Sequence, residues 1–211
     1  MIKGIVFDLD GVLVFTDEYH YLAWKEVFNE EGLRFDREMN NKLRGVSRRD
    51  SLEIVLKENG ASIPEQRKQR ILKTKNDIYV AFLNDRLSPD SIDPKTRAAL
   101  EEFRGRGIKL AVGSSSKNAK LILGKTGMLG MFDVICDGTM ISNSKPDPEV
   151  FVKAASMIGL KPKDCIVVED GEAGIIAAKR GGFIPVAIGS EISPELAEIR
   201  ISSITDISRL I

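Results

Sequence analysis

The sequence has 211 residues, of which 43% are hydrophobic and 29% are charged, a balance typical of a globular protein and not of a disordered chain. Its 31 basic and 31 acidic residues cancel to a formal net charge of +0, which argues against a main role in coating nucleic acid or an anionic membrane. Two cysteines and one histidine are too few for most zinc sites built from thiolates and imidazoles.

Five short apolar runs predict buried strands, and helix-like stretches separate the later ones. The strands are expected at residues 2–9, 108–112, 132–136, 165–168 and 184–188. Apolar side chains recur at helical spacing over residues 94–104, 117–126, 147–158 and 172–180. Buried strands that alternate with helices imply right-handed crossovers. The predicted fold class is therefore α/β, a Rossmann-like open parallel sheet with helices on both faces.

Residues 16–89 break this alternation, because they show helical periodicity and no convincing strand. The helices expected there span residues 17–31, 37–59 and 64–86. We therefore expect an α/β core of residues 1–15 and 90–211, interrupted after its first strand by a small helical cap domain. The crossings near Thr16 and Pro89 are the expected hinges, since inserted lids of this kind close over a site.

No stretch of the sequence predicts a membrane span or a targeting signal. Asp8 and Asp10 interrupt the first apolar run, and no uncharged stretch reaches the ~18–20 residues that cross a bilayer. We expect a cytoplasmic protein with no membrane partner and no nucleic-acid partner. Cys136 and Cys165 lie in apolar runs and are expected to be buried, reduced thiols.

Polar side chains collect where the predicted parallel strands end, which is the edge at which such sheets bind ligands. Each of these residues by itself could be the N-cap of the following helix. The whole set is better explained as one site. Its members are Asp8, Asp10 and Gly11 after the first strand, Ser114, Ser115 and Ser116 after the second, Lys145 after the third, and Glu169 and Asp170 after the fourth.

Carboxylates gathered at one edge need a cation. Two unit charges about 4 Å apart repel by about 4 kcal/mol at an effective dielectric constant near 20. Oxygen ligands with no nearby thiolate or imidazole favour Mg²⁺ over Zn²⁺. Mg²⁺ leaves room for phosphate oxygens, so with a lysine and a hydroxyl beside it the set predicts a phosphoryl-transfer site.

Asp8 and Asp10 alternate at the end of an extended strand, so their side chains project to the same side. This arrangement suits a nucleophile and a general acid–base that act on one phosphorus. Asp8 would attack and become an aspartyl phosphate, while Asp10 would protonate the leaving oxygen and deprotonate the incoming one. Gly11 would let the phosphate approach the backbone closely.

Four ordered segments carry a family resemblance. Asp8-Leu9-Asp10-Gly11-Val12, then Ser114, then Lys145-Pro146-Asp147-Pro148, then Glu169-Asp170 resemble the motifs of the haloacid dehalogenase superfamily, and the insertion resembles its small helical cap. Further segments resemble the β-phosphoglucomutase family, which interconverts β-glucose 1-phosphate and glucose 6-phosphate through a bisphosphate. These segments are Glu18-Tyr19-His20, Ala23-Trp24-Lys25, Gly45-Val46-Ser47-Arg48, Asp50-Ser51-Leu52, Lys75-Asn76-Asp77 and Ser114-Ser115-Ser116-Lys117-Asn118.

The resemblance implies roles for the core residues. It makes Asp8 the phosphorylated nucleophile and Asp10 the acid–base. Mg²⁺ would be held by the Asp8 carboxylate, the Asp10 backbone carbonyl and Asp170, with Glu169 nearby or ligating. The residues that would hold the transferring phosphate are Ser114 and Lys145.

The resemblance also implies a grip on a second phosphate, held by Arg48 of the cap with Ser116 and Asn118 of the core. Residues 116–118 fall where a helix is expected to begin, so their free amides would bind an anion, and Arg48 would add a planar charged fork. Without the surrounding motif Arg48 would be interpreted as a solvated charge at a helix end. The remaining residues expected to face the sugar or the hinge are Thr16, His20, Trp24, Gly45, Val46, Ser51, Lys75 and Ser115.

Several interpretations stay open at this point. His20 and Trp24 could be packed side chains without a role in the site. Phe15 occupies a position where the family usually has an acid, while Asp17 lies two residues further on.

The main functional alternative to a phosphomutase is a Mg²⁺-dependent phosphatase that passes the aspartyl phosphate to water. Arg48, Lys75 and Asn118 favour a sugar as the acceptor. A signalling switch that stores phosphate on an aspartate would need no helical insertion, and a dehalogenase would need no metal. We expect a monomer whose partners are a small sugar phosphate and a sugar bisphosphate.

Overall fold

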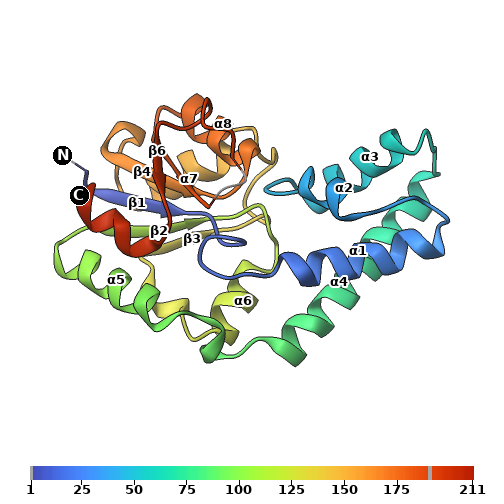
Figure 1. Ribbon diagram of the computed structural model, residues 1–211, viewed down its shortest axis with the longest axis horizontal. Helices are drawn as coiled ribbons and strands as arrows, with labels where there is room; N and C mark the ends of the chain where they lie inside the picture. Colours follow the sequence, from blue (N-terminus) through green and yellow to red (C-terminus); the bar gives the residue numbers. More distant parts are fainter. Residues whose placement is uncertain (1, 190–191) are drawn as a thin grey trace.

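The computed structural model describes residues 2–189 and 192–211. Its centre is a six-stranded sheet with the order β3-β2-β1-β4-β5-β6, and every neighbouring pair is parallel. The predicted α/β class with an open parallel sheet is therefore confirmed (Figure 1). The strands are β1 (Gly4–Phe7), β2 (Lys109–Gly113), β3 (Val134–Cys136), β4 (Cys165–Glu169), β5 (Ile184–Ile188) and β6 (Ile199–Ile201).

The edge strand β6 has no counterpart among the predicted strands. It is only 3 residues long, and the charged Arg200 stands at its centre, so the sequence offers no apolar run there. It is a strand because the backbone of β5 presents hydrogen-bonding groups that it can pair with.

Helices cover both faces of the sheet, because successive strand residues point to opposite sides. Ile5 and Phe7 of β1 pack in one apolar cluster with residues of α5 and α6, whereas Val6 packs in another with residues of α7 and α8. These helices are α5 (Pro94–Gly105), α6 (Ala119–Lys125), α7 (Glu149–Met157) and α8 (Glu172–Arg180). Short 3₁₀ helices span Pro89–Ser91, Leu129–Met131, Pro162–Asp164 and Ile204–Arg209.

The inserted segment forms four helices with an apolar core of its own (right side of Figure 1). They are α1 (Asp17–Glu30), α2 (Arg37–Asn41), α3 (Arg48–Glu58) and α4 (Glu65–Arg86). Trp24 and Phe28 stack at 4.7 Å between ring centroids within that core. We call these helices and their connections the cap, and we keep its boundaries at residues 16 and 89 as a proposal.

The predicted single helix over residues 37–59 is wrong, because the chain breaks it between α2 and α3. Gly45 has φ +75, a left-handed conformation that does not occur within a right-handed helix. Ser47 then starts α3 anew, since its hydroxyl accepts a hydrogen bond from the Asp50 amide at 3.2 Å. We call residues 42–47 the cap loop.

Two further observations bear on the expectations from composition. Cys136 and Cys165 are buried and not bonded to each other, in line with their apolar surroundings. Among the described helices, none combines the length and the apolar character that crossing a membrane would require.

The conformation of Gly45 leads to a stability prediction. Gly45→Ala should lower the free energy of unfolding by about 1 kcal/mol, because an alanine resists the left-handed region. The matched control is Gly105→Ala in α5, where the added methyl group meets nothing within 4 Å and should be neutral or slightly stabilising. Thermal unfolding of both variants checks this, and equal effects would contradict it.

Candidate active site

The carboxyl ends of β1 and β4 bring three carboxylates and one lysine together. Asp8 follows β1, Glu169 ends β4 and Asp170 comes next, and oxygens of all three lie within 4.8 Å of one another. Lys145 reaches them from the loop before α7, and its Nζ donates to Asp8 Oδ1 at 2.5 Å and to Glu169 Oε1 at 2.7 Å. All four side chains are buried, so one ammonium group is shared between carboxylates that water cannot screen.

Two glycines make room for these acids. A Cβ atom on Gly11, which has φ +86, would lie 2.0 Å from Asp170 Oδ2. A Cβ atom on Gly174, in the first turn of α8, would lie 1.9 Å from Glu169 Oε1. The sequence analysis singled out Gly11 and missed Gly174, because only the packing of α8 against β4 shows what Gly174 accommodates.

Burial and mutual repulsion set the titration of these groups. Burial, reinforced by the nearby Glu169 and Asp10 carboxylates against the pull of Lys145, raises the pKa of Asp8 from 3.8 to about 7. Burial and the charges of Glu169 and Asp8 raise the pKa of Asp170 from 3.8 to about 9. Burial by itself would lower the pKa of Lys145, but its two carboxylate partners outweigh burial and raise it. When all three carboxyl groups are ionised, Lys145 and the Arg44 guanidinium, which is shared with Asp17, do not offset their negative charge.

The donor set fits Mg²⁺. Buried carboxylate oxygens are the ligands this ion prefers, and a divalent cation would supply the positive charge that Lys145 alone does not. Asp8, Asp170 and the Asp10 backbone carbonyl would hold the ion, with Glu169 nearby. Such an ion would also lower the pKa of Asp8 and favour the ionised form that a nucleophile needs.

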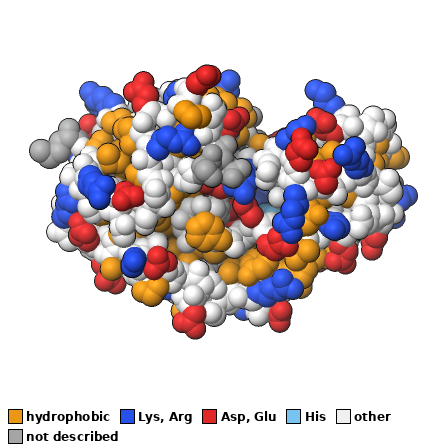
Figure 2. All heavy atoms as spheres, viewed as in Figure 1, with side chains coloured by type: hydrophobic (Ala, Val, Ile, Leu, Met, Phe, Trp, Pro, Cys, Tyr) orange, Lys and Arg blue, Asp and Glu red, His pale blue; other side chains and the backbone are white. Residues whose placement is uncertain are grey.

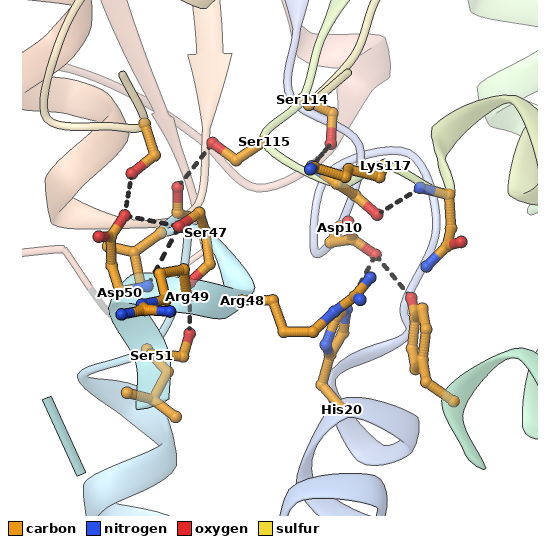
Figure 3. Close-up of a pocket in the computed structure, with 18 of the residues that line it drawn as sticks. Asp10, His20, Ser47, Arg48, Arg49, Asp50, Ser51, Ser114, Ser115 and Lys117 are labelled. Atoms are coloured by element: carbon orange, nitrogen blue, oxygen red, sulfur yellow. Dashed lines mark hydrogen bonds and ion pairs between the residues drawn. The ribbon is translucent and has the colours of Figure 1, made fainter. Parts of the chain in front are cut away.

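Asp10 is held by groups from the hinge and the cap (Figure 3). The Thr16 hydroxyl donates to Asp10 Oδ1, Tyr79 donates to the same oxygen at 3.5 Å, and His20 Nε2 lies 3.8 Å from it. Burial acts to raise the pKa of Asp10, but the hydrogen bonds from His20 and Thr16 lower it. The sequence analysis missed Tyr79, which lies one helical turn after Lys75 on α4.

Lys75 is buried beside His20, one of the groups that contact Asp10. Its Nζ lies 2.8 Å from His20 Nδ1, 5.3 Å from the centre of the Trp24 ring and 4.4 Å from that of Tyr79. Burial, together with the charge of Arg48, lowers the pKa of Lys75 well below its ordinary value. Trp24 packs in the cap core and also lines the cavity, so core packing and a place in the site are both compatible with its position.

A second cluster joins the cap to the core around one amide oxygen. Arg48 Nη2 of α3 donates to Asn76 Oδ1 at 2.6 Å, and Asn118 Nδ2 of the core donates to the same oxygen at 3.0 Å. Arg48 Nη1 also donates to the Leu72 carbonyl at 3.4 Å. Within the described residues Arg48 makes no ion pair, so its charge is not neutralised by a carboxylate. The sequence analysis named Asn76 within the segment Lys75-Asn76-Asp77 but assigned it no role in the site.

The expectation that the amides of residues 116–118 are free is wrong for two of them. The Ser116 amide donates to Ser114 Oγ at 3.0 Å, and the Asn118 amide donates to Ser116 Oγ at 3.2 Å. The helix α6 begins only at Ala119, so short hydroxyl turns precede it. The side chain of Asn118, and not its backbone N–H group, contacts the cap.

The cap loop touches the core directly. Ser115 Oγ donates to the Gly45 carbonyl at 3.0 Å, and Ser144 Oγ of the core donates to Asp50 of α3. Ser51 is buried, and its hydroxyl donates to the Ser47 carbonyl of its own helix at 2.9 Å. These contacts place the cap against the carboxyl edge of the sheet.

A cavity of about 640 Å³ lies between the cap and the core, where Figure 2 shows charged side chains of both signs around a hollow. The predicted site residues Thr16, Lys145 and Glu169 do not line it, since they are buried behind Asp8 and Asp10. The predicted residues that do line it are Asp8, Asp10, His20, Trp24, Gly45, Val46, Arg48, Ser51, Lys75, Ser114, Ser115, Ser116, Asn118 and Asp170.

Phe15 does not supply the acid that the resemblance places there. Its side chain is 76% exposed and does not line the cavity. Asp17 forms an ion pair with Arg44 Nη2 of the cap loop at 2.6 Å, so its carboxylate contacts the cap loop. Arg44 also lines the cavity, and the sequence analysis did not single it out.

Comparison with known proteins places the chain in a family. A family model described as haloacid dehalogenase-like hydrolase matches residues 2–182. The chain belongs to this family. The predicted membership of the haloacid dehalogenase superfamily is therefore confirmed.

Relatives of known name include both mutases and phosphatases. The chain is 39% identical to the β-phosphoglucomutase of Bacillus subtilis over 189 residues, which covers 89% of this chain and 83% of that protein. It is 26% identical to the fructose-1-phosphate phosphatase YqaB of Escherichia coli, over 88% of this chain and 95% of that protein. The crystal structure of a β-phosphoglucomutase from Clostridium difficile superposes with a TM-score of 0.91 at 33% identity, covering 98% of this chain and 93% of that one.

The raised pKa values predict that Mg²⁺ stabilises the protein more at higher pH. With a chelator present, Asp8 and Asp170 keep their protons in the folded protein at pH values where they have lost them in the unfolded chain. The free energy of unfolding should therefore fall as the pH rises from about 4 to about 7 for Asp8, and from about 4 to about 9 for Asp170. Mg²⁺ needs the ionised forms, so the increase in melting temperature that it causes should be larger at pH 8 than at pH 5.5.

Thermal unfolding at the two pH values, with Mg²⁺ or a chelator, measures this effect. In Asp8→Asn the dependence should weaken, because one of the two titrating carboxyl groups is gone. A stabilisation by Mg²⁺ that is equal at both pH values would contradict the assignment of these groups to the metal.

Proposed function

We propose that the protein is a sugar phosphomutase that interconverts β-D-glucose 1-phosphate and glucose 6-phosphate through phosphorylated Asp8 and a sugar bisphosphate. The observation that carries this proposal is the cluster of Arg48, Asn76 and Asn118. Donors from the cap and from the core converge on one neutral oxygen, and none of the described carboxylates pairs with the guanidinium. Such a cluster suits a second phosphate, which a mutase must hold while the first one reacts.

The core residues support transfer to and from Asp8. The Asp8 carboxylate would attack the phosphorus of a bisphosphate, the bond between phosphorus and the sugar oxygen would break, and Asp10 would give that oxygen a proton. In the reverse direction a sugar hydroxyl would attack the phosphorus on Asp8 and lose its proton to Asp10. Ser114 and Lys145 would hold the moving phosphoryl group, and Mg²⁺ would neutralise its negative charge.

The cap supports a sugar acceptor in preference to water. Its contacts with the core through Gly45 and Asp50 cover the carboxyl edge of the sheet. Asp10 is held by Thr16, His20 and Tyr79, so a movement of the cap would also move the acid–base. All of these groups come from a single chain, and we propose that the active protein is a monomer. The cytoplasmic location also stays a prediction.

A phosphatase that acts on a small sugar phosphate is the second candidate. The Escherichia coli relative and the phosphorylated carbohydrates phosphatase of Thermotoga maritima, 28% identical over 86% of this chain, favour it. The two candidates share every step up to phosphorylated Asp8 and differ only in whether a sugar or water accepts the phosphoryl group.

A coupled assay decides between them. We expect β-glucose 1-phosphate, Mg²⁺ and a trace of glucose bisphosphate to yield glucose 6-phosphate faster than free phosphate. Asp8→Asn should lower both activities by at least ~10³-fold, because an amide is not a nucleophile at phosphorus. Release of free phosphate without glucose 6-phosphate would refute the mutase and support the phosphatase.

The proposed second-phosphate grip predicts a selective loss. Arg48→Ala should raise the KM for isomerisation roughly 10–100-fold, the expected loss of a charge-assisted contact with phosphate. Hydrolysis of p-nitrophenyl phosphate, which has a single phosphate, should change less than about twofold.

The matched control is the adjacent Arg49→Ala. The Arg49 guanidinium is already bound by Glu65 at 2.6 Å and by Glu53 at 3.0 Å, so both activities should stay near the wild-type values. Equal losses on both substrates in Arg48→Ala, or equal losses in the two arginine variants, would count against a dedicated second-phosphate site.

A further inference from the structure

Arg44 in the cap loop links the cap to the proposed metal site. Its Nη1 lies 3.1 Å from Asp170 Oδ2 of the core, and its Nη2 lies 2.6 Å from Asp17 Oδ2 at the start of α1. The guanidinium is thus shared between an acid of the cap and an acid of the core. Its Nε atom is buried and has no hydrogen-bond partner among the described residues, so the side chain is held through its two Nη atoms.

The contact with Asp170 differs in kind from the contacts that the cap makes with Ser115, Asn118 and Ser144 of the core. Ser115 with Gly45 and Asn118 with Asn76 are neutral hydrogen bonds, and Ser144 offers Asp50 only a hydroxyl group. The contact of Arg44 with Asp170 places a guanidinium against a carboxyl group across the boundary, and it requires the cap to lie against the core.

We propose that Arg44 is a positioning residue that couples closure of the cap to divalent-cation binding at Asp170. The proposal rests on the assignment of Asp170 to Mg²⁺ and not on which phosphate ester the enzyme takes. Arg44 and Mg²⁺ draw on the same carboxylate and repel each other, so each weakens the binding of the other. The cation alone therefore favours an open cap.

A phosphate group changes this balance. Its negative charge, placed beside both cations, offsets their repulsion and lets the cap close with Mg²⁺ in place. Arg44 keeps its ion pair with Asp17 when the cap opens, because both residues belong to the cap. The cap then closes on a phosphate ester together with the metal, which is the state in which water must be excluded.

Titration calorimetry with Mg²⁺ alone tests the coupling. Arg44→Gln should bind Mg²⁺ about fivefold more tightly than the wild type, or tighter still, because the competing charge is gone. Arg44→Lys keeps the charge and should bind within about twofold of the wild type. The matched control is Arg34→Gln, which removes a cap charge whose partner is the exposed Asp36.

Small-angle scattering measures the cap itself. For the wild type, Mg²⁺ should increase the radius of gyration relative to a chelator, and further addition of inorganic phosphate should reverse the increase. In Arg44→Gln the radius should be the same with Mg²⁺ and with chelator. Circular dichroism establishes that each variant is folded.

The outcomes distinguish failure of the metal assignment from failure of the coupling. If the wild type binds no Mg²⁺, both the metal assignment and the coupling fail. If the wild type binds Mg²⁺ but Arg44→Gln binds it equally or more weakly, or if Mg²⁺ leaves the wild-type radius unchanged, the coupling fails and the proposed phosphoryl transfer stands.

Discussion

The excess of buried negative charge at the end of β1 and β4 is the constraint on which the rest of the site depends. Asp8 and Glu169 share the single ammonium group of Lys145, Asp170 lies beside them with only the shared guanidinium of Arg44 as a partner in the described chain, and burial removes the water that would screen these charges. Fold stability by itself gives no reason to assemble such a group, since buried ion pairs are often replaceable by apolar side chains. A reaction that brings a cation and a phosphoryl group into this pocket does give a reason.

The cap contacts this group of carboxylates through the cap loop, where its helices are interrupted. The chain leaves the helix after Asn41, and the left-handed Gly45 keeps it from resuming before α3, so the cap loop contacts Ser115 and Asp170 of the core. The hinge side works differently, because Thr16 and His20 contact Asp10 itself. The proposed nucleophile Asp8 and the proposed acid–base Asp10 therefore have different supports, since Asp8 contacts the core residue Lys145 and Asp10 contacts residues of the hinge and the cap.

The same frame serves mutases and phosphatases, and the difference lies in what the cap offers beyond the reacting phosphorus. Arg48 and Asn118 both donate to the side-chain oxygen of Asn76, a weak acceptor that a phosphate could displace. A carboxylate at that position would have neutralised the guanidinium. The neutral partner leaves the positive charge of Arg48 available for an anion, which is why this cluster weighs more in the proposal than the shared core motif does.

The sequence alone determined the fold class, the insertion after the first strand and the order of the acidic motifs. These follow from local signals, since apolar runs, helical periodicity and strand-end acids are read within about ten residues. The break at Gly45, the strand around Arg200 and the hydroxyl turns before α6 depended on partners elsewhere in the chain. Tertiary structure also decided which polar groups meet, because Arg44 and Asp170, and likewise Asn76 and Asn118, are far apart in sequence and come into contact only where the cap lies on the core.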